Sequence, residues 1–196
     1  MRITGGDFRG RVLKVPRGDR VRPTQDLVRE ALFSMLCESV PGCRFLDLFA
    51  GTGAVGLEAM SRGASEVVWV EGDRAVARLT AANVAGIAGE AAASRVVCSD
   101  AFRWIRSAGR GAAFELVFAD PPYVDAREDG LARLAAELAG CDTVAAGGIL
   151  VTEIPDRAPV AALQGWETVR DRAYGKTRLV LRRRLAPDAG EGKTKQ

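Results

Sequence analysis

The sequence contains no histidine and few cysteines. Its 196 residues include four cysteines, Cys37, Cys43, Cys98 and Cys141, and no two of them form a CxxC pair. This spacing favours neither a structural zinc site nor a disulfide framework, and we expect no metal. Cys37, Cys98 and Cys141 lie in or beside apolar runs and are expected in the core. The absence of histidine excludes Ser-His-Asp hydrolysis and Cys-His proteolysis, so any proton transfer would use carboxylates, lysine, tyrosine or solvent.

Long hydrophobic runs are also absent. No stretch approaches the roughly 18 uncharged residues that a spanning helix needs, so we expect no membrane association. The N-terminus carries a charge but no apolar segment typical of a secretion signal, and a cytoplasmic location is expected by default. The length suits one α/β domain, with room for an appendage of about thirty or forty residues. We expect a monomer.

Charge is unevenly distributed, although the net charge is only +3. Between Met1 and Arg29 three acidic residues stand against eight basic ones: Arg2, Arg9, Arg11, Lys14, Arg17, Arg20, Arg22 and Arg29. Such clustering is typical of a surface that binds a polyanion, because each neutralised phosphate releases counterions. A solvated basic arm would have the same composition, so composition alone leaves both interpretations open.

The first forty residues predict a hairpin followed by a helix. Short β-like pieces alternate with glycines over residues 1–16. Thr24 is the expected N-cap of the helix, with Asp26 in its first turn. Apolar residues then recur at helical spacing, leaving Arg29 and Glu30 off the apolar stripe: Leu27, Val28, Ala31, Leu32, Met35 and Leu36. We interpret residues 1–40 as an RNA-binding extension and residues 41–185 as the catalytic domain.

From residue 45 onward, short apolar runs alternate with amphipathic stretches, which is the pattern of consecutive βαβ units. Strands are expected at residues 45–49, 67–71, 96–99, 116–119 and 149–153. Residues 166–173 and 177–184 flank Tyr174-Gly175-Lys176 and predict a terminal antiparallel hairpin. Residues 186–196 are expected to form a flexible tail. The fold class is therefore α/β with a mostly parallel sheet.

A glycine-rich loop follows the first of these strands. Gly51, Gly53 and Gly56 satisfy the GxGxxG pattern, and Glu71 stands where a ribose-binding acid is expected. Absent Cβ atoms let a ligand approach the backbone, and the helix N-terminus offers unpaired N–H groups. By itself this pattern favours a nicotinamide or flavin enzyme.

Two further carboxylates favour a different ligand. Asp47 lies inside the strand before the loop, where it can meet an ammonium group, and a dinucleotide has none to offer. Asp100 follows the third strand and is placed to accept from an adenine amine. A ligand with an amino acid end, a ribose and an adenine would use Asp47, Glu71 and Asp100 in turn, and S-adenosylmethionine is that molecule. The alternative is that these acids only cap the next helices.

The sequence Asp120-Pro121-Pro122-Tyr123 comes directly after the fourth strand. Two prolines stiffen the loop and donate no N–H, which leaves rigid acceptors. Hydrogen bonds from an amine on a base ring to Asp120 and to the Pro121 carbonyl would orient its nitrogen for methyl transfer. Tyr123 offers an aromatic face for a base turned out of its stack. A simple strand-end turn is the alternative.

Over nearly the whole chain, these residues resemble the RsmD-type methyltransferases of bacterial 16S ribosomal RNA, which modify guanine at N2. The resemblance rests on the opening Arg2–Gly6 with Arg9-Gly10-Arg11, the Arg22–Phe33 helix signature, Leu46–Gly56, Val70-Glu71 and Asp120–Tyr123. Residue 25 departs from the family, because Gln25 stands where a threonine is common. Residues 124–147 show no pattern that matches.

The resemblance implies a Rossmann-like class I methyltransferase fold with a seven-stranded sheet and one reversed strand. It implies that Asp120, Pro121, Pro122 and Tyr123 hold the guanine. Thr24, Asp47, Gly51, Thr52, Gly53, Glu71, Asp100 and Ala101 would form the S-adenosylmethionine site. With the basic segment, Arg9, Arg11, Lys14, Arg20 and Arg22 become candidates for RNA contacts. The expected partner is 16S rRNA, in 30S particles or assembly intermediates.

Three other functions compete with this interpretation. A DNA amino-methyltransferase would normally need a sizeable domain to read a duplex, and about forty N-terminal residues leave little room for one. An NAD-linked oxidoreductase would rest on the Gly51–Gly56 pattern. A non-catalytic RNA-binding module would use only the basic segment. Labelled methyl transfer to RNA and to DNA would discriminate among them.

Overall fold

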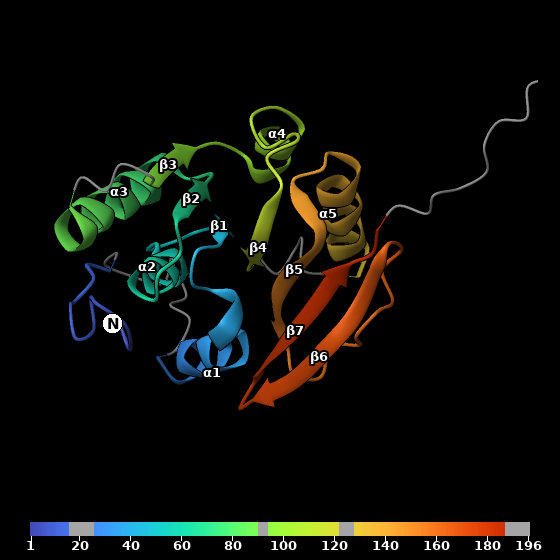
Figure 1. Ribbon diagram of the computed structural model, residues 1–196, viewed down its shortest axis with the longest axis horizontal. Helices are drawn as coiled ribbons and strands as arrows, with labels where there is room; N and C mark the ends of the chain where they lie inside the picture. Colours follow the sequence, from blue (N-terminus) through green and yellow to red (C-terminus); the bar gives the residue numbers. More distant parts are fainter. Residues whose placement is uncertain (16–25, 90–93, 122–127, 187–196) are drawn as a thin grey trace, which may run out of the picture.

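The chain folds around one seven-stranded sheet with helices on both faces (Figure 1). The computed structural model describes residues 1–15, 26–89, 94–121 and 128–186. Its elements in chain order are α1 (Asp26–Leu36), η1 (Cys37–Ser39), β1 (Arg44–Leu48), α2 (Ala54–Ser61), β2 (Glu66–Glu71), α3 (Arg74–Ala88), β3 (Ser94–Cys98), α4 (Ala101–Arg106), β4 (Phe114–Ala119), α5 (Glu128–Gly140), β5 (Val144–Pro155), β6 (Trp166–Tyr174) and β7 (Thr177–Arg184).

The strand order in the sheet is β3-β2-β1-β4-β5-β7-β6. The first five strands are parallel to one another, and β7 runs antiparallel between β5 and β6. The predicted mostly parallel sheet with one reversed strand is thus confirmed, as is the hairpin of β6 and β7. The order reverses direction beside β1, where β2 lies on one side and β4 on the other, and open α/β sheets bind ligands at such a switch point.

Two hydrophobic cores lie on opposite faces of the sheet. One contains buried side chains of α1, α2 and α3, and the other contains those of α4 and α5. The central strands β1, β2 and β4 contribute to both, which is why they are almost continuously apolar. Ile3 and Leu13 are buried in the first core. The N-terminal segment therefore shares its core with the sheet, and Figure 1 shows it beside α2 and α3.

The N-terminal hairpin is shorter than expected. Residues 1–15 form one isolated antiparallel bridge, Arg2 to Val12, and no strand. Their main-chain groups bond to one another, as in Ile3 N–H to the Arg11 carbonyl and Gly10 N–H to the Ile3 carbonyl, both at 2.9 Å. They also bond to α2, since Thr4 and Gly5 donate to Glu58 and Asp7 donates to the Ser61 carbonyl at 2.8 Å. The segment is thus held both by hydrogen bonds within itself and by docking on α2.

Two residues of α1 do not follow the predicted stripe. Leu27 is 66% exposed, and Arg29 is fully buried although the pattern placed it on the polar side. The core expectation for cysteines was also wrong in part, since Cys37 and Cys98 are exposed while Cys43 and Cys141 are buried. All four thiols are free. Among the described helices, none has the length and apolarity to cross a membrane.

Candidate active site

The carboxyl ends of the parallel strands bring several of the predicted site residues to one edge of the sheet. Leu48 of β1 lies beside Val70 of β2 and beside Ala119 of β4. The glycine loop after β1, Glu71 at the end of β2 and Asp120 after β4 therefore leave the sheet side by side. Asp100 follows β3 at the same edge, one strand further out.

The glycine loop is shaped by left-handed backbone and close packing. Gly51 and Gly53 have φ values of 56° and 79°, which favour glycine. The Gly51 carbonyl accepts from the Thr80 hydroxyl at 2.6 Å. A Cβ on Gly53 would lie 2.7 Å from Thr80 Cγ2, and one on Gly56 only 2.2 Å from Trp69 Nε1. The absence of a Cβ at Gly53 and Gly56 thus lets the loop and α2 pack closely on α3 and β2.

Two carboxylates accept hydrogen bonds from backbone N–H groups of this loop and of the helix after it. The Gly51 amide donates to Glu71 Oε2 at 2.9 Å, and the Gly56 amide donates to Asp47 Oδ2 at 2.9 Å. Glu71 Oε1 also accepts from the Asp73 amide at 2.8 Å. In dinucleotide-binding folds such N–H groups face a pyrophosphate. Here an anion approaching the same groups would meet two negative side chains.

Asp47 is 1% exposed, and its environment perturbs its titration. Burial raises the pKa of Asp47 well above its usual value, and the hydrogen bond from the Gly56 amide opposes this effect. The negative charges of Glu71 and Asp120 raise the pKa of Asp47 further. These carboxylates are therefore close enough to interact, and together they form an acidic edge that suits a cationic ligand.

The outer part of the edge carries Asp100 and Ala101. Asp100 is exposed and caps α4, because its Oδ1 accepts from the Arg103 amide at 2.8 Å. The capping alternative is thus realised, and a role in adenine binding stays a prediction. Ala101 is buried at the first position of α4.

Thr52 is buried, and its hydroxyl lies 3.5 Å from Met1 Sδ. Its carbonyl accepts from the Asn83 side chain at 2.9 Å. Both contacts hold the loop to the N-terminus and to α3. A contact of Thr52 with the cofactor therefore stays a prediction.

Asp120 and Pro121 directly follow β4 at the centre of the edge. Asp120 is half-buried, and Pro121 is buried. The fourth predicted strand begins at Phe114, two residues earlier than expected. Pro122, Tyr123 and Thr24 lie outside the described residues, so their predicted roles remain predictions.

The basic residues near the N-terminus divide into exposed and anchored ones. Arg9 is exposed. The Arg11 guanidinium donates to the Ile87 carbonyl of α3 and lies 5.1 Å from the centre of the Phe8 ring. The main chain of Lys14 exchanges two hydrogen bonds with the Asn83 side chain, each 2.9 Å long. Arg20 and Arg22 lie outside the described residues.

Sequence reasoning missed a buried ion cluster beside this segment. Glu58 of α2 is fully buried and accepts from the Thr4 amide and hydroxyl, each at 2.8 Å. Arg62 Nη2 lies 2.8 Å from Glu58 Oε1, and Arg29 Nε lies 3.4 Å from Glu58 Oε2. Arg29 also donates to the Arg2 carbonyl and to Asp26. A glutamate inside the otherwise apolar helix Ala54–Ser61 was the signal that could have revealed this cluster.

Burial alone would raise the pKa of Glu58. Hydrogen bonds from Thr4 and Arg62, with the charge of Arg62, outweigh that effect and lower the pKa below its ordinary value. Glu58 therefore stays ionised and joins the N-terminal segment, α1 and α2. Arg29 belongs to this cluster and is not available to a polyanion, which reduces the basic surface expected from composition.

The described residues contain no group of three or more acidic, cysteine or histidine side chains able to hold a metal ion. The order of the sheet, the reversed β7 and the loop-and-carboxylate edge after β1 define a Rossmann-like fold of the S-adenosylmethionine-dependent methyltransferase type.

Comparison with known proteins gives a consistent result. The family model described as conserved hypothetical protein 95 matches residues 1–183. The ribosomal RNA small subunit methyltransferase D of Escherichia coli K12 is 44% identical over 123 residues, which are 63% of this chain and 60% of that protein. The putative rRNA methyltransferase YlbH of Bacillus subtilis is 36% identical over 70% of this chain and 74% of its own length.

A solved structure, the putative methyltransferase yhhF of Escherichia coli, superposes with a TM-score of 0.83 at 34% identity and covers 95% of this chain and 99% of its own. The chain belongs to the family described as conserved hypothetical protein 95. The predicted resemblance to RsmD-type methyltransferases is confirmed.

Proposed function

We propose that this protein transfers a methyl group from S-adenosylmethionine to the exocyclic N2 of a guanine in 16S ribosomal RNA. The observation that carries this proposal is the juxtaposition of Asp120-Pro121 with the glycine loop at one edge of the sheet. The names of the relatives from Escherichia coli and Bacillus subtilis support rRNA as the substrate class.

The acidic edge fits S-adenosylmethionine better than a dinucleotide. The cofactor carries an ammonium and a sulfonium, and a positive charge beside Asp47, Glu71 and Asp120 would relieve the mutual repulsion of these carboxylates. NAD carries a pyrophosphate, whose usual N–H partners are already bonded to carboxylates here. Asp47 would face the amino acid end, Glu71 the ribose and Asp100 the adenine amine.

The reaction needs orientation more than acid or base strength. Bound S-adenosylmethionine supplies an electrophilic methyl group on a positively charged sulfur. Asp120 and the Pro121 carbonyl accept from the two N–H groups of the guanine amine and aim its nitrogen at that carbon. The N–C bond forms as the C–S bond breaks, its electron pair stays on sulfur, and the amine proton leaves to Asp120 or to solvent. Histidine is not required.

The experiment is transfer of a tritiated methyl group to three substrates: 30S particles, protein-free 16S rRNA and duplex DNA. We expect labelling of RNA in at least one of its two forms, followed by mapping of the label to one guanine N2. Labelling of DNA alone would overturn the RNA assignment. Labelling of none of the three would contradict methyl transfer to nucleic acid.

A further inference from the structure

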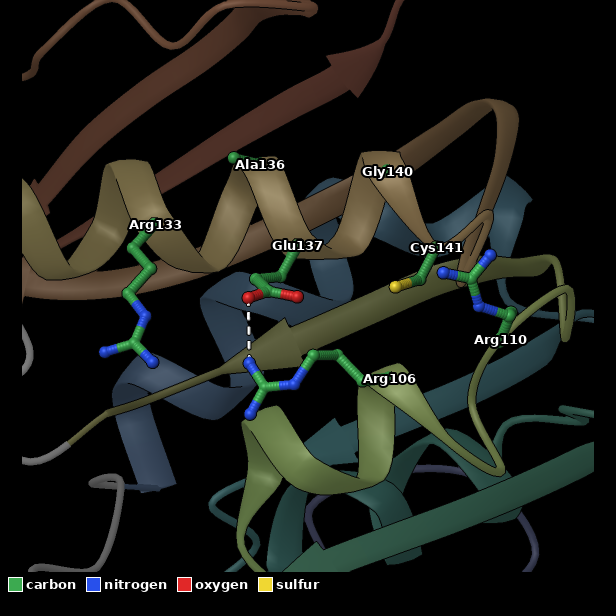
Figure 2. A pocket seen from close by; sticks show the side chains of 7 residues that line it. All are labelled: Arg106, Arg110, Arg133, Ala136, Glu137, Gly140 and Cys141. Atoms are coloured by element: carbon green, nitrogen blue, oxygen red, sulfur yellow. Dashed lines mark hydrogen bonds and ion pairs between the residues drawn. The ribbon is translucent and has the colours of Figure 1, made fainter.

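An open groove lies between α4 and α5, on the face of the sheet opposite the N-terminal segment. Its volume is about 580 Å³. It is lined by Arg106, Arg110, Arg133, Ala136, Glu137, Gly140 and Cys141. Figure 2 shows Arg133 on α5, with Arg106 at the end of α4 and Arg110 after it facing α5, and Glu137 beside Arg106. None of these residues belongs to the site described above.

The groove has an excess of positive charge. Arg106 Nη1 pairs with Glu137 Oε1 at 2.8 Å, and both side chains are partly exposed. Arg110 and Arg133 are exposed and have no ion pair with any described side chain. The Arg133 guanidinium lies 4.5 Å from the centre of the Phe102 ring, which holds it in place without neutralising it. Two arginines are therefore available to an anion.

The shape suits a linear polyanion. Ala136 and Gly140 are small, so α5 leaves room for a backbone to approach between the arginines. From Arg133 to Gly140 the helix advances by about 10 Å at 1.5 Å per residue. The groove is therefore long enough for more than one phosphate, since the axial spacing within one strand of a duplex is about 3.4 Å. A guanidinium fork also matches phosphate oxygens in two-point contacts.

One end of the groove lies toward the sheet edge that carries Asp100 and Asp120. Arg133 stacks on Phe102 in the first turn of α4, which starts directly after Asp100. Arg110 follows α4 and marks the far end, beside Cys141 (Figure 2). A strand whose guanine reaches Asp120 would therefore pass over Arg133 first.

We propose that this groove binds consecutive phosphates of the RNA backbone next to the methylated guanine. This inference rests on the proposed function, because it assumes that the polyanion is RNA. The N-terminal basic residues lie on the other face of the sheet. Together with them, the groove would place RNA contacts on both sides of the sheet edge that carries Asp47, Glu71 and Asp120.

The test uses the double variant Arg110→Gln/Arg133→Gln and RNA-binding titrations with protein-free 16S rRNA at several salt concentrations. The slope of log K against log salt should become shallower by about 1.4 if two phosphates of single-stranded RNA are no longer neutralised. S-adenosylmethionine affinity and melting temperature should not change. Arg110→Lys/Arg133→Lys keeps both charges and should retain most of the slope.

Arg170→Gln/Arg172→Gln is the matched control, since these exposed arginines lie on β6, away from the groove. It should leave the slope unchanged. If wild type binds and methylates RNA but Arg110→Gln/Arg133→Gln keeps the wild-type salt slope, the RNA-binding role of the groove is overturned and the proposed function is not. A wild type that neither binds nor methylates RNA would instead overturn the proposed function. A defect on 30S particles that is absent on protein-free rRNA would assign the groove to a ribosomal protein and overturn the RNA-backbone proposal.

Discussion

Asp120 is the residue on which the proposed chemistry depends most directly. Replacing it with alanine removes an acceptor for the guanine amine while leaving β4 and the glycine loop in place. We expect turnover to fall by roughly 100-fold or more, with cofactor affinity near the wild-type value. Single-turnover methylation and calorimetric titration of S-adenosylmethionine measure the two quantities.

Asp100→Ala supplies the contrasting variant. It should weaken cofactor binding and leave the single-turnover rate at saturating cofactor close to wild type, at a stability cost of about 1 kcal/mol for removing the cap of α4. If Asp120→Ala reduced cofactor affinity as strongly as Asp100→Ala does, Asp120 would belong to the cofactor site.

Asp47 is expected to lower the free energy of unfolding while it contributes to cofactor binding. Its pKa is raised in the folded protein, so the folded state holds its proton more tightly than the unfolded chain does. The free energy of unfolding therefore falls as pH rises from the unfolded value, 3.8, to the higher folded pKa. Asp47→Asn removes this penalty and keeps an acceptor for the Gly56 amide.

We expect Asp47→Asn to melt at a higher temperature than wild type at pH 8, with a smaller difference at pH 4, and to bind S-adenosylmethionine less tightly. Thermal melts at both pH values and a cofactor titration provide the check. A melting difference that did not vary with pH would contradict a perturbed carboxyl at position 47.

At the scale of elements, apolar patterning predicted the strands well where both faces are buried. The strands β1 and β2, whose residues are nearly all buried, begin within one residue of their expected positions. The more exposed β3 begins two residues early. β5 was predicted only over residues 149–153 but extends from Val144 to Pro155. Its first half contains Gly147 and Gly148 and pairs irregularly with β4, so it lacks the run of large apolar residues that marks a buried strand.

Long-range ion pairs could not be read from the sequence. Arg29 has a polar side chain at a position that periodicity placed off the core, and it is buried only because Glu58, Asp26 and the Arg2 carbonyl meet it there. The site residues at the ends of strands were brought together as expected, because parallel strands end at a common edge. Their precise partners, such as Glu71 with the Gly51 amide, depend on loop geometry.

The Glu58 cluster predicts a large stability effect. Glu58→Gln leaves the fully buried Arg29 without its buried carboxylate, which should cost about 3–5 kcal/mol. Because the folded pKa of Glu58 is lowered, its contribution is fully present above the unfolded value, 4.5, and disappears as pH falls through the folded value. Urea unfolding at pH 7 and near pH 3 should show a large deficit at the first and a smaller one at the second.

Glu66→Gln is the matched control for this prediction. Glu66 pairs with Arg44 at 2.7 Å, but both side chains are about one third exposed. An exposed pair contributes about 0–1 kcal/mol. Equal destabilisation by Glu58→Gln and Glu66→Gln would mean that the buried ion cluster contributes no more to stability than the exposed Glu66–Arg44 pair.

At the scale of the whole molecule, the active edge lies between two surfaces with basic residues. The N-terminal segment packs on α2 and α3, and the groove lies between α4 and α5 on the other face of the sheet. Under the proposed function, these two surfaces would contact RNA on both sides of the reacting base.

Arg9→Ala/Arg11→Ala tests the N-terminal side. We expect weaker RNA binding and a salt slope shallower by roughly 0.7 to 0.9 for each phosphate that is no longer neutralised. Because Arg11 also donates to the Ile87 carbonyl, melting should be compared, and Arg9→Ala alone should give the cleaner electrostatic effect. A slope identical to wild type in both variants would remove the segment from the RNA interface.

Trp69 lies under the glycine loop, where its indole Nε1 donates to the Gly53 carbonyl at 3.2 Å. The other two tryptophans, Trp104 and Trp166, belong to the core on the opposite face. Trp69 is thus an intrinsic fluorophore that contacts the glycine loop. A double Trp104→Phe/Trp166→Phe variant should retain a change in emission when S-adenosylmethionine is added, so binding can be followed without RNA, label or turnover.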